Sequence, residues 1–411
     1  MRIALVELAG KGGLIHYAYQ LSSAMQAAGA EVTLITDRNY ELEALPHSFE
    51  VRPVLRLWDP KPASDSPHAM VRRMRRAARA ARYYREWERA ARELRGMGPD
   101  VVQLGDIRFA TDLAAIHRVG RTAPILADIC HNVRPFSGGE GSTGSFHLSS
   151  IQRRFYSRIY RRFDAVFVHY ETNRREFERV FPESSPRVHQ IVHGNERIFD
   201  QLADPDVTPA TLRQRLGIRD GVKVVLFFGT LSRYKGLDLL LRAFRSVAER
   251  VPEAHLVLAG FPFSDFDPGE FRAQAASFGL GERVSLVPQY IDSREVRVWI
   301  GMGDVVVFPY RSVFQSGALH LACTFGSPIV ATRVGANAEL IRDGENGLLI
   351  RPDDEGALAD ALVRLLEDEA LARRLGEAVE RDAETYLSWD GVARTMLDAY
   401  ESLIEKRRDA R

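Results

Sequence analysis

Two basic side chains in the second half of the chain stand between glycines, in the order Gly229, Arg233, Lys235 and Gly236. A short apolar run, which predicts a buried strand, precedes them, and the apolar-periodic stretch 237–250, which predicts a helix, follows. Ligands of open α/β sheets bind at the carboxyl ends of the strands. Arginine, lysine and free backbone N–H groups neutralise a diphosphate without a metal. We therefore interpret Arg233 and Lys235 as groups that stabilise a leaving diphosphate; the alternative is two solvated loop cations.

A second loop, Gln315-Ser316-Gly317-Ala318, lies between a predicted strand at 305–308 and a predicted helix. Backbone N–H groups at the start of a helix bind anions, and Gly317 allows a ligand to approach the backbone closely. The loop is equally consistent with an ordinary helix cap by Ser316, and a cap and an anion site can coincide. We expect this loop to contact the same diphosphate.

The first half of the chain offers two further candidate contacts. Gly12 and Gly13 follow the first predicted strand and precede a helix, so they bring amides to the ligand from the opposite wall. Alternatively, this pair forms only a tight turn. His131 follows an apolar run at the carboxyl end of a strand, where both a ligand contact and a structural histidine are reasonable.

Two sheets are needed to position these groups, because the alternation of strands and helices stops and then restarts. Strands are predicted at 3–6, 31–36, 100–104, 124–128, 165–168 and 188–192, and again at 223–228, 255–259, 284–287, 305–308 and 328–331. The length of 411 residues fits two domains of roughly 200 residues each. We predict an α/β protein with Rossmann-like, doubly wound domains at 1–195 and 223–388, joined by a linker at 196–222 and facing across a cleft.

The composition argues against several classes of protein. The formal net charge of +1 does not favour nucleic acid as a partner. Cys130 and Cys323 are the only cysteines, too few for a disulfide framework, and no closely spaced His/Cys set suggests zinc. No apolar run approaches the ~20 residues of a membrane span, and early charges at the N-terminus do not fit a signal peptide. We expect a cytoplasmic protein without a metal site.

The segments that carry a family resemblance are Phe228 to Leu240, Val306 to Tyr310, Gln315 to Ala318, Gly326 to Thr332, Gly335, Glu339 and Asp343 to Leu349, together with Gly12-Gly13, Cys130-His131-Asn132 and His193-Gly194-Asn195. In this order and spacing they resemble the retaining GT-B glycosyltransferases of family 4, also called glycosyl transferases group 1. The resemblance covers almost the whole chain.

The resemblance implies an activity and roles for individual residues. The activity is metal-independent hexosyl transfer, with no cofactor, from a nucleotide sugar such as a UDP- or GDP-sugar to a glycan, lipid-linked or small-molecule acceptor. The donor is expected mainly in the C-terminal half, with Gly229 at the diphosphate, the base near Tyr290 and Glu339 near the ribose or sugar; Glu339 also suits the first turn of a helix. His131 is expected to contact the sugar. The last helix, 389–411, is expected to cross back to the N-terminal domain.

The sequence departs from the family at two positions. Many members carry two glutamates separated by seven residues, but the aligned positions here are Val313 and Leu321, which accept no hydrogen bond. The Gln-Ser-Gly loop resembles a variant of the family, so we expect activity but assign no ribose contact; the neighbouring His320 points away from Leu321 on a helix. Two alternatives stay open: a pseudoenzyme that binds nucleotide sugar as a partner subunit, and a nucleotide-sugar epimerase or phosphorylase on the same scaffold.

One stretch, from Arg72 to Arg95, is strongly basic. It holds arginines at 72, 73, 75, 76, 79, 82, 85, 89, 92 and 95, against glutamates at 86, 88 and 93. Met70, Met74, Ala77, Ala81, Tyr84 and Ala91 form a thin apolar stripe on the same predicted helix. Such a helix is either solvated, with arginine stems covering apolar neighbours, or a peripheral contact with anionic lipid at the inner membrane face.

Overall fold

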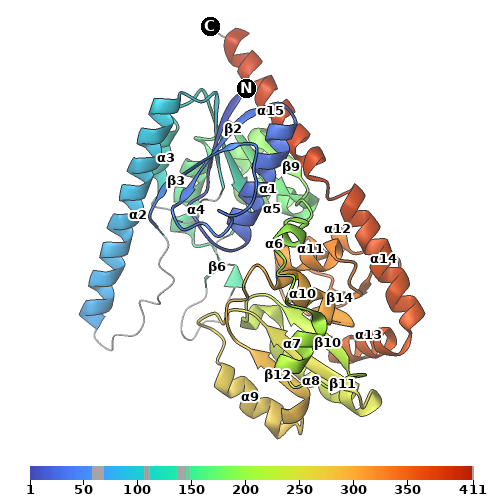
Figure 1. Ribbon diagram of the computed structural model, residues 1–411. Coiled ribbons are helices and arrows are strands. Elements are labelled where there is room, and N and C mark those ends of the chain that lie inside the picture. Colours follow the sequence, from blue (N-terminus) through green and yellow to red (C-terminus); the bar gives the residue numbers. More distant parts are fainter. Residues whose placement is uncertain are drawn as a thin grey trace.

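The computed structural model describes residues 1–57, 69–105, 107, 109, 112–134, 136–137, 145–146 and 148–409. It contains two all-parallel sheets, one formed by each half of the chain, and each is covered by helices (Figure 1). Loops that follow strands in one half hydrogen-bond to loops that follow strands in the other, so the carboxyl edges of the two sheets face each other. The predicted α/β fold with two Rossmann-like domains is confirmed.

The N-terminal sheet has the strand order β3-β2-β1-β4-β5-β8-β9. The strands are β1 (Arg2–Val6), β2 (Glu31–Asp37), β3 (Glu50–Leu55), β4 (Val101–Leu104), β5 (Ile125–Cys130), β8 (Ala165–His169) and β9 (Val188–Ile191). Side chains alternate across β1, so that Ile3 and Leu5 join one apolar cluster while Ala4 and Val6 join another. Helices on both faces bury these clusters, which explains why the strands are apolar throughout.

The helices of this half divide between the two clusters. Helices α1 (Gly13–Ala27) and α15 (Trp389–Asp409) contribute to the first cluster. The second cluster is completed by α2 (Ala69–Met97), α3 (Leu113–Val119), α4 (Ser150–Tyr160) and α5 (Tyr170–Val180). The helix at the very end of the chain therefore lies on the N-terminal sheet, where Tyr400 donates a hydrogen bond to Gln103 at 2.5 Å.

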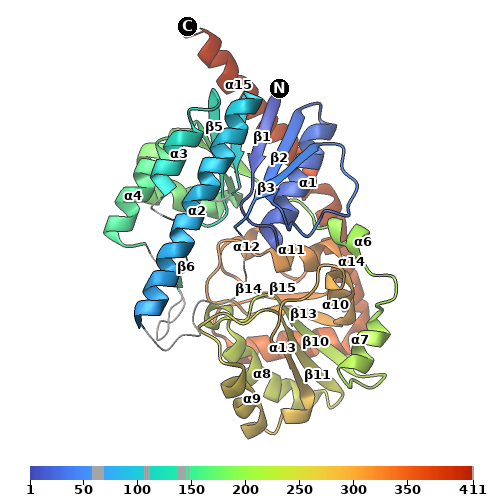
Figure 2. The same cartoon turned by 60° about the vertical axis from the view of Figure 1, so that its left-hand side comes forward.

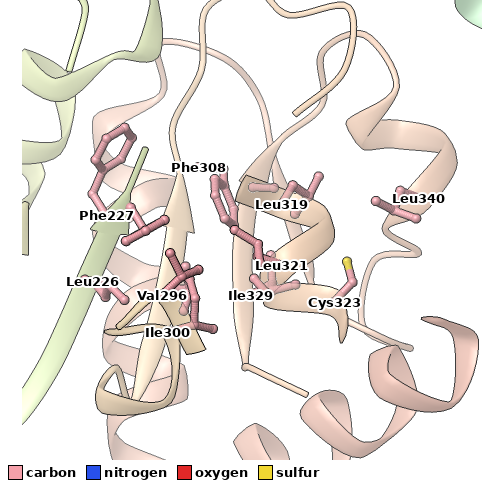
Figure 3. Packing of buried hydrophobic residues seen from close by; sticks show 14 of the residues in the cluster. Leu226, Phe227, Val296, Ile300, Phe308, Leu319, Leu321, Cys323, Ile329 and Leu340 are labelled. Atoms are coloured by element: carbon pink, nitrogen blue, oxygen red, sulfur yellow. The ribbon is translucent and has the colours of Figure 1, made fainter. Parts of the chain in front are cut away.

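The C-terminal sheet has the strand order β12-β11-β10-β13-β14-β15. The strands are β10 (Lys223–Phe228), β11 (Ala254–Ala259), β12 (Val284–Val287), β13 (Val305–Phe308), β14 (Ile329–Thr332) and β15 (Leu348–Ile350). Helices α8 (Leu237–Arg250), α10 (Val296–Met302), α11 (Gly317–Thr324) and α13 (Glu355–Glu367) pack around it. Phe227, Phe308, Leu319 and Ile329 are fully or almost fully buried in this core (Figure 3).

The remaining elements connect or flank these layers. They are β6 (Phe136–Ser137) paired antiparallel with β7 (Ser145–Phe146), the short helices η2 (Pro182–Arg187), α6 (Ile198–Leu202), α7 (Pro209–Arg215), η3 (Arg233–Lys235), η4 (Gly281–Arg283) and α12 (Asn337–Leu340), and the longer α9 (Pro268–Ser277) and α14 (Glu369–Thr385). Strands β3 and β15 were not predicted. Strand β3 carries Pro53 and charged residues at the edge of its sheet, and β15 has only three residues.

The arginine-rich stretch forms the long helix α2, whose first half extends away from the N-terminal sheet (Figures 1 and 2). Its second half is anchored by buried Tyr83, Trp87 and Leu94. Met70 and Met74 are exposed, at 75% and 67%. The side chains of Arg72, Arg73, Arg75, Arg76 and Ala77 lie outside the described residues. In the part of the chain that the structure describes, no helix is both long and apolar enough to span a bilayer.

The chain crosses between the two halves twice, and the crossings touch. Asn195 donates its N–H to the carbonyl of Leu387 at 2.7 Å, and the indole N–H of Trp389 donates to the carbonyl of Asn195 at 2.7 Å. Gly194 packs on that indole so closely that a Cβ would lie 2.1 Å from a ring carbon. The segment His193-Gly194-Asn195 is therefore part of the connection between the halves, and Gly194 leaves room for Trp389.

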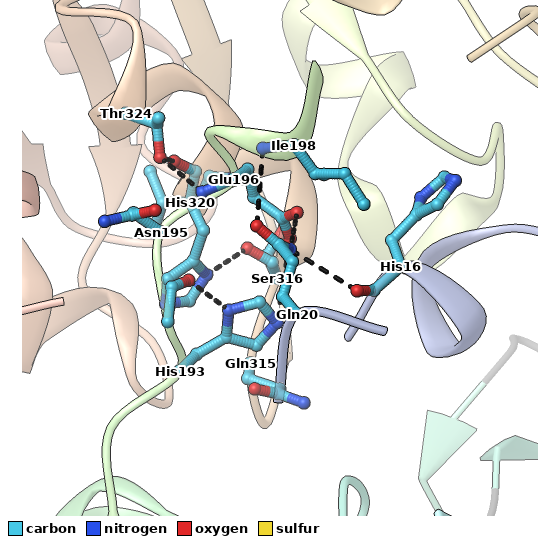
Figure 4. Close-up of polar contacts among 12 residues, drawn as sticks. His16, Gln20, His193, Asn195, Glu196, Ile198, Gln315, Ser316, His320 and Thr324 are labelled. Atoms are coloured by element: carbon cyan, nitrogen blue, oxygen red, sulfur yellow. Dashed lines mark hydrogen bonds and ion pairs between the residues drawn. The ribbon is translucent and has the colours of Figure 1, made fainter. Parts of the chain in front are cut away.

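Four buried histidines fill the space between the facing sheet edges. His131, His169 and His193 follow or end β5, β8 and β9, and His320 comes from α11. The ring centroids of His193 and His320 are 4.2 Å apart, and those of His131 and His169 are 5.2 Å apart. His320 donates from Nδ1 to the Ser316 carbonyl at 2.8 Å (Figure 4). It accepts from the Tyr170 hydroxyl at 2.5 Å. These bonds join the two halves through neutral imidazoles.

Burial decides the charge of this cluster. It lowers the pKa of His131 to about 3 and that of His193 to about 4, and it lowers the pKa of His169 and His320 well below the usual value. Burial also raises the pKa of the nearby Glu196 carboxyl to about 8, although Gln20 donates a hydrogen bond to it at 3.2 Å (Figure 4). The cluster formed by these histidines and Glu196 is therefore uncharged at neutral pH.

We predict that acid destabilises the protein. The four histidines take up protons only on unfolding below about pH 6.5, so stability that is present above this pH is lost as the pH falls. Between about pH 7.5 and about pH 5 each histidine accounts for a loss of about 2 kcal/mol, while Glu196 regains about 3 kcal/mol. Urea denaturation should show a net loss of about 5 kcal/mol in the free energy of unfolding.

The variant His193→Gln should reduce the proton uptake on unfolding by about one. Calorimetric unfolding in two buffers of different ionisation enthalpy counts the protons directly in the unmodified protein. A free energy of unfolding that stays constant over this pH range would contradict the neutral cluster.

Candidate active site

The loop between β10 and α8 is shaped by two glycines. Gly229 has φ 129° and Gly236 has φ 68°, conformations that favour glycine. A Cβ on Gly236 would lie 2.0 Å from the carbonyl oxygen of Pro309, so no other residue fits. A Cβ on Gly229 would come 3.3 Å from the Lys235 ammonium and 3.4 Å from the Cβ of Ala318. These three predicted residues, Gly229, Lys235 and Ala318, therefore meet at one place on the sheet edge.

Lys235 carries a buried ammonium group without a counter-ion. Only 6% of the residue is exposed, and within the described residues no carboxylate pairs with it. Its Nζ lies 3.4 Å from the Tyr310 hydroxyl and 4.9 Å from the centroid of that ring. Burial lowers the pKa of Lys235 to about 8. An unpaired buried cation is unfavourable, so this position is prepared for an anion.

The N-terminus of α11 lies beside this ammonium group. Ser316 caps the helix by accepting from the N–H of Leu319 at 3.3 Å, as the cap interpretation predicted, and its hydroxyl is 3.1 Å from that of Tyr310. Within the described residues, the N–H groups of Gly317 and Ala318 donate to no acceptor. Free N–H groups and the helix dipole both favour an anion here. The cap and a possible anion site are thus the same structure.

The opposite wall is the glycine loop before α1. The exposed Gly13 begins the helix, and nothing lies within 4 Å of where its Cβ would be. The N–H of Gly12 is already used, because it donates to Glu41 at 2.6 Å. Glu41 also meets His16 at 2.8 Å and accepts a hydrogen bond from the Tyr290 hydroxyl, 2.9 Å away in the C-terminal half. Burial alone would raise the pKa of Glu41, but these partners together lower it.

His131 and Gln315 connect the two walls. The Gln315 amide nitrogen lies 2.9 Å from Nδ1 of His131, and because an amide N–H can only donate, Nδ1 accepts and Nε2 carries the proton. The Gln315 Oε1 atom is buried without a hydrogen-bond partner among the described residues. His131 is therefore held as a neutral hydrogen-bond donor, and Gln315 retains an unused acceptor. Figure 4 shows Gln315 beside Ser316.

Two of the predicted site residues are engaged elsewhere. The Glu339 carboxylate accepts the N–H groups of Glu171 at 3.0 Å and Thr172 at 2.7 Å, and so caps α5 of the N-terminal half. The Arg233 side chain donates to the carbonyl of Asp265 at 2.9 Å and is 61% exposed. The structure therefore does not bring Glu339 or Arg233 together with the Lys235 ammonium.

Val313 and Leu321, which replace the two family glutamates, are buried in the apolar core. A Cβ on Gly335 would lie 1.8 Å from the Val313 carbonyl oxygen, so this backbone is tightly packed. Neither side chain offers a polar atom, and the structure adds no substitute for a ribose contact at these positions.

The chain has two Asp-x-Asp spacings, Asp204 with Asp206 and Asp265 with Asp267. Asp204 accepts the N–H of Asp206, and Asp267 caps α9. Among the residues that the structure describes, no group of three His, Cys, Asp or Glu side chains is arranged to hold a metal ion. Asp204 is thus explained by a turn and Asp267 by a helix cap.

Two contacts of the site were missed from the sequence. Glu41 follows β2 and Tyr310 follows β13, so both stand at the carboxyl edge where ligands bind, and that position was the available signal. The structure brings together Gly229, Lys235, Tyr310, Ser316, Gly317 and Ala318 on one wall and Gly12, Gly13 and His131 on the other.

The two halves of the chain match two domain families. Residues 12–195 match the family described as glycosyl transferase 4-like domain, and residues 222–368 match glycosyl transferases group 1. The D-inositol 3-phosphate glycosyltransferase of Xylanimonas cellulosilytica is 31% identical over 252 residues, 60% of this chain and 59% of that protein. The enzyme of the same name from a Nocardioides species is 32% identical over 214 residues, 49% of this chain and 46% of that protein. The matched part thus spans about half the length of these relatives.

Solved structures share the fold over nearly the whole chain. A sucrose-phosphate synthase from Thermosynechococcus elongatus superposes with a TM-score of 0.72 at 21% identity, covering 98% of this chain and 99% of that one. HepE of Anabaena, solved with UDP and glucose, has a TM-score of 0.68 at 18% identity, covering 98% and 100%. The two halves of the chain thus each match a glycosyltransferase domain family, and the likeness to these solved structures shows the GT-B fold.

Proposed function

We propose that the protein transfers a hexose from a nucleotide-diphosphate sugar to a hydroxyl group of an acceptor, without a metal and with retention at the anomeric carbon. One observation supports this most strongly: the buried, unpaired ammonium of Lys235 lies beside the free N–H groups that begin α11. A diphosphate is the anion that this combination suits, because it offers several oxygens to one cation and two amides.

Charge stabilisation is the main chemical contribution of this wall. As the bond to the sugar breaks, negative charge grows on the diphosphate, and Lys235 with the Gly317 and Ala318 amides stabilises it without reorganising. Arg233 would join them only if its guanidinium left the Asp265 carbonyl. The base of the nucleotide would lie near Tyr290, and Glu339 would reach the ribose only by releasing α5.

The N-terminal half would hold the sugar and acceptor. The exposed Gly13 lies on the opposite wall, and neutral His131, whose ring also hydrogen-bonds to the Gly105 backbone, would donate from Nε2 to a sugar hydroxyl only by releasing that partner. The nearby carboxylates are occupied: Glu41 by Gly12 and Tyr290, and Glu339 by α5. Because neither of these two carboxylates is free to form a covalent intermediate, attack on the same face as the departing diphosphate accounts for retention.

The comparisons support the donor class. Two solved structures of the same fold contain UDP or UDP-glucose, and two curated relatives are named D-inositol 3-phosphate glycosyltransferases. We propose a UDP- or GDP-sugar as donor and a glycan, lipid-linked or small-molecule acceptor. The pseudoenzyme and the nucleotide-sugar epimerase are the alternatives that the following experiment separates.

We predict that Lys235→Met lowers turnover at least about 100-fold, because the diphosphate loses its cation. The assay incubates purified protein with UDP-, GDP- and dTDP-sugars, with and without acceptor extracts, and measures release of the nucleoside diphosphate. Lys223→Met is the matched control, since this lysine pairs with Glu369 near the protein surface. It should change turnover less than about twofold.

Equal turnover of the Lys235 and Lys223 variants would refute the assigned role. Nucleotide-sugar binding with no turnover under any condition would favour the pseudoenzyme. Conversion of the sugar to its epimer without release of the diphosphate would favour the epimerase.

We also propose that the outer half of α2 contacts anionic lipid, as a peripheral association at the cytoplasmic face of the membrane. Exposed Met70 and Met74 stand on a helix whose Arg79, Arg82 and Arg85 are exposed as well. Apolar side chains among arginines are what an interfacial helix presents to anionic headgroups.

The double variant Met70→Asp, Met74→Asp should bind vesicles of phosphatidylglycerol about tenfold more weakly than the unmodified protein, because two apolar contacts are lost. Co-sedimentation measures the bound fraction, and Tyr386→Asp, an exposed aromatic on the other half of the molecule, is the control. Equal sedimentation with anionic and neutral vesicles would rule out this contact.

A further inference from the structure

We propose that a second pocket of the C-terminal half, separate from the diphosphate site, binds a neutral polyhydroxylated ligand, that is, a sugar unit. The pocket is a hollow of about 690 Å³ between the first turns of α8 and α9 and the loops that follow β10, β11 and β13. Small-molecule sites commonly have volumes in this range. The inference concerns binding alone and does not depend on sugar transfer.

Helix η3 separates the two sites. Lys235, at its end, has its ammonium buried against Tyr310, on the diphosphate side. Arg233, at its start, is exposed and lines the hollow. The side chain of Lys235 thus lies at the diphosphate site and that of Arg233 lines the hollow. A ligand in the hollow would lie against the outer side of the loop that holds Lys235.

Asp265 lines the hollow and carries a buried acceptor without a partner among the described residues. Its Oδ2 accepts from the Ser232 hydroxyl at 2.6 Å and from the N–H of Arg233 at 3.2 Å. Its Oδ1 has no hydrogen-bond partner within the described residues, and the residue is buried, with only 8% of its surface exposed. An unsatisfied buried acceptor is unfavourable, and a hydroxyl group of a ligand would satisfy it.

The charges around the hollow are largely paired among themselves. Asp238 accepts from Arg242 at 3.1 Å and from Arg311 at 2.8 Å, and Asp267 caps α9. The lining contains three arginines and four carboxylates in all, so neither a strong anion nor a strong cation meets a surplus of opposite charge. This balance distinguishes the hollow from the diphosphate site.

The groups that remain match hydroxyls. Asp265 Oδ1 is an acceptor, the guanidinium of Arg233, whose Nη2 lies 3.8 Å from Glu270, is a donor, and the amide of Gln274 is both. A sugar hydroxyl also donates and accepts, so one ring can satisfy neighbouring groups of opposite kind. Tyr234 and Phe266 provide ring surface for the C–H face of a sugar. We therefore assign the ligand to neutral sugars.

The test measures binding directly by saturation-transfer NMR and calorimetry. The probes are methyl glucoside, methyl galactoside, methyl mannoside, maltose and cellobiose at millimolar concentration, with spermidine and inorganic phosphate as ionic probes. At least one neutral sugar should bind to the unmodified protein. Asp265→Asn keeps one acceptor for Ser232 and Arg233 but converts the free acceptor into a donor, and it should weaken binding at least about tenfold.

Gln274→Trp, which fills the hollow from a partly exposed helix position, should abolish sugar binding. This second variant keeps the proposal testable even where Asp265→Asn disturbs the fold. Lys235→Met should leave it unchanged, and UDP should still bind to Asp265→Asn. The proposal is overturned if no neutral sugar binds, if binding survives Gln274→Trp, if it is lost in Lys235→Met, or if spermidine or phosphate occupies the hollow instead. Any of the first three results would overturn this proposal without contradicting the proposed sugar transfer.

Discussion

The ammonium group of Lys235 is buried with no carboxylate beside it among the described residues, and the C-terminal half of the site is arranged around that fact. Gly229 leaves room for the ammonium, Gly236 lets the loop turn under the Pro309 carbonyl, and α11 directs its first free N–H groups to the same place. Removing a cation from water without a partner costs free energy. The fold tolerates this cost because a large apolar core, which includes β10 and β13, stabilises the domain around it.

The N-terminal half approaches this cation through polar groups that are mostly neutral. Four imidazoles, the protonated Glu196 and the hydroxyl of Tyr170 hold the two sheet edges together. Two charged caps act at the rim, where Glu41 joins the Gly12 loop to Tyr290 and Glu339 begins α5. These hydrogen bonds supplement an apolar cluster that includes residues of both halves.

The fold and the meeting of Gly229, Lys235 and Ala318 at one sheet edge could be predicted because their signals are local. Strands of apolar residues, helix periodicity and glycines at Gly229, Gly236 and Gly317 each depend on a few neighbouring residues. The partners of Glu339 and Arg233 could not be predicted in this way. Glu339 caps a helix 168 residues away in the sequence, and Arg233 bonds to a carbonyl 32 residues away. Tyr310 and Glu41 were missed for the same reason, since their contacts form only when separate loops meet.

The most direct test of the account is the proton uptake that accompanies diphosphate binding. Burial holds the pKa of Lys235 at about 8, and a bound anion favours the charged form and raises that pKa. Calorimetric titration with UDP and GDP at about pH 8.5, in two buffers of different ionisation enthalpy, should therefore show uptake of up to about 0.7 proton, and Lys235→Met should show none. Tight binding of the nucleoside diphosphate with no proton uptake in the unmodified protein would contradict the central role of Lys235.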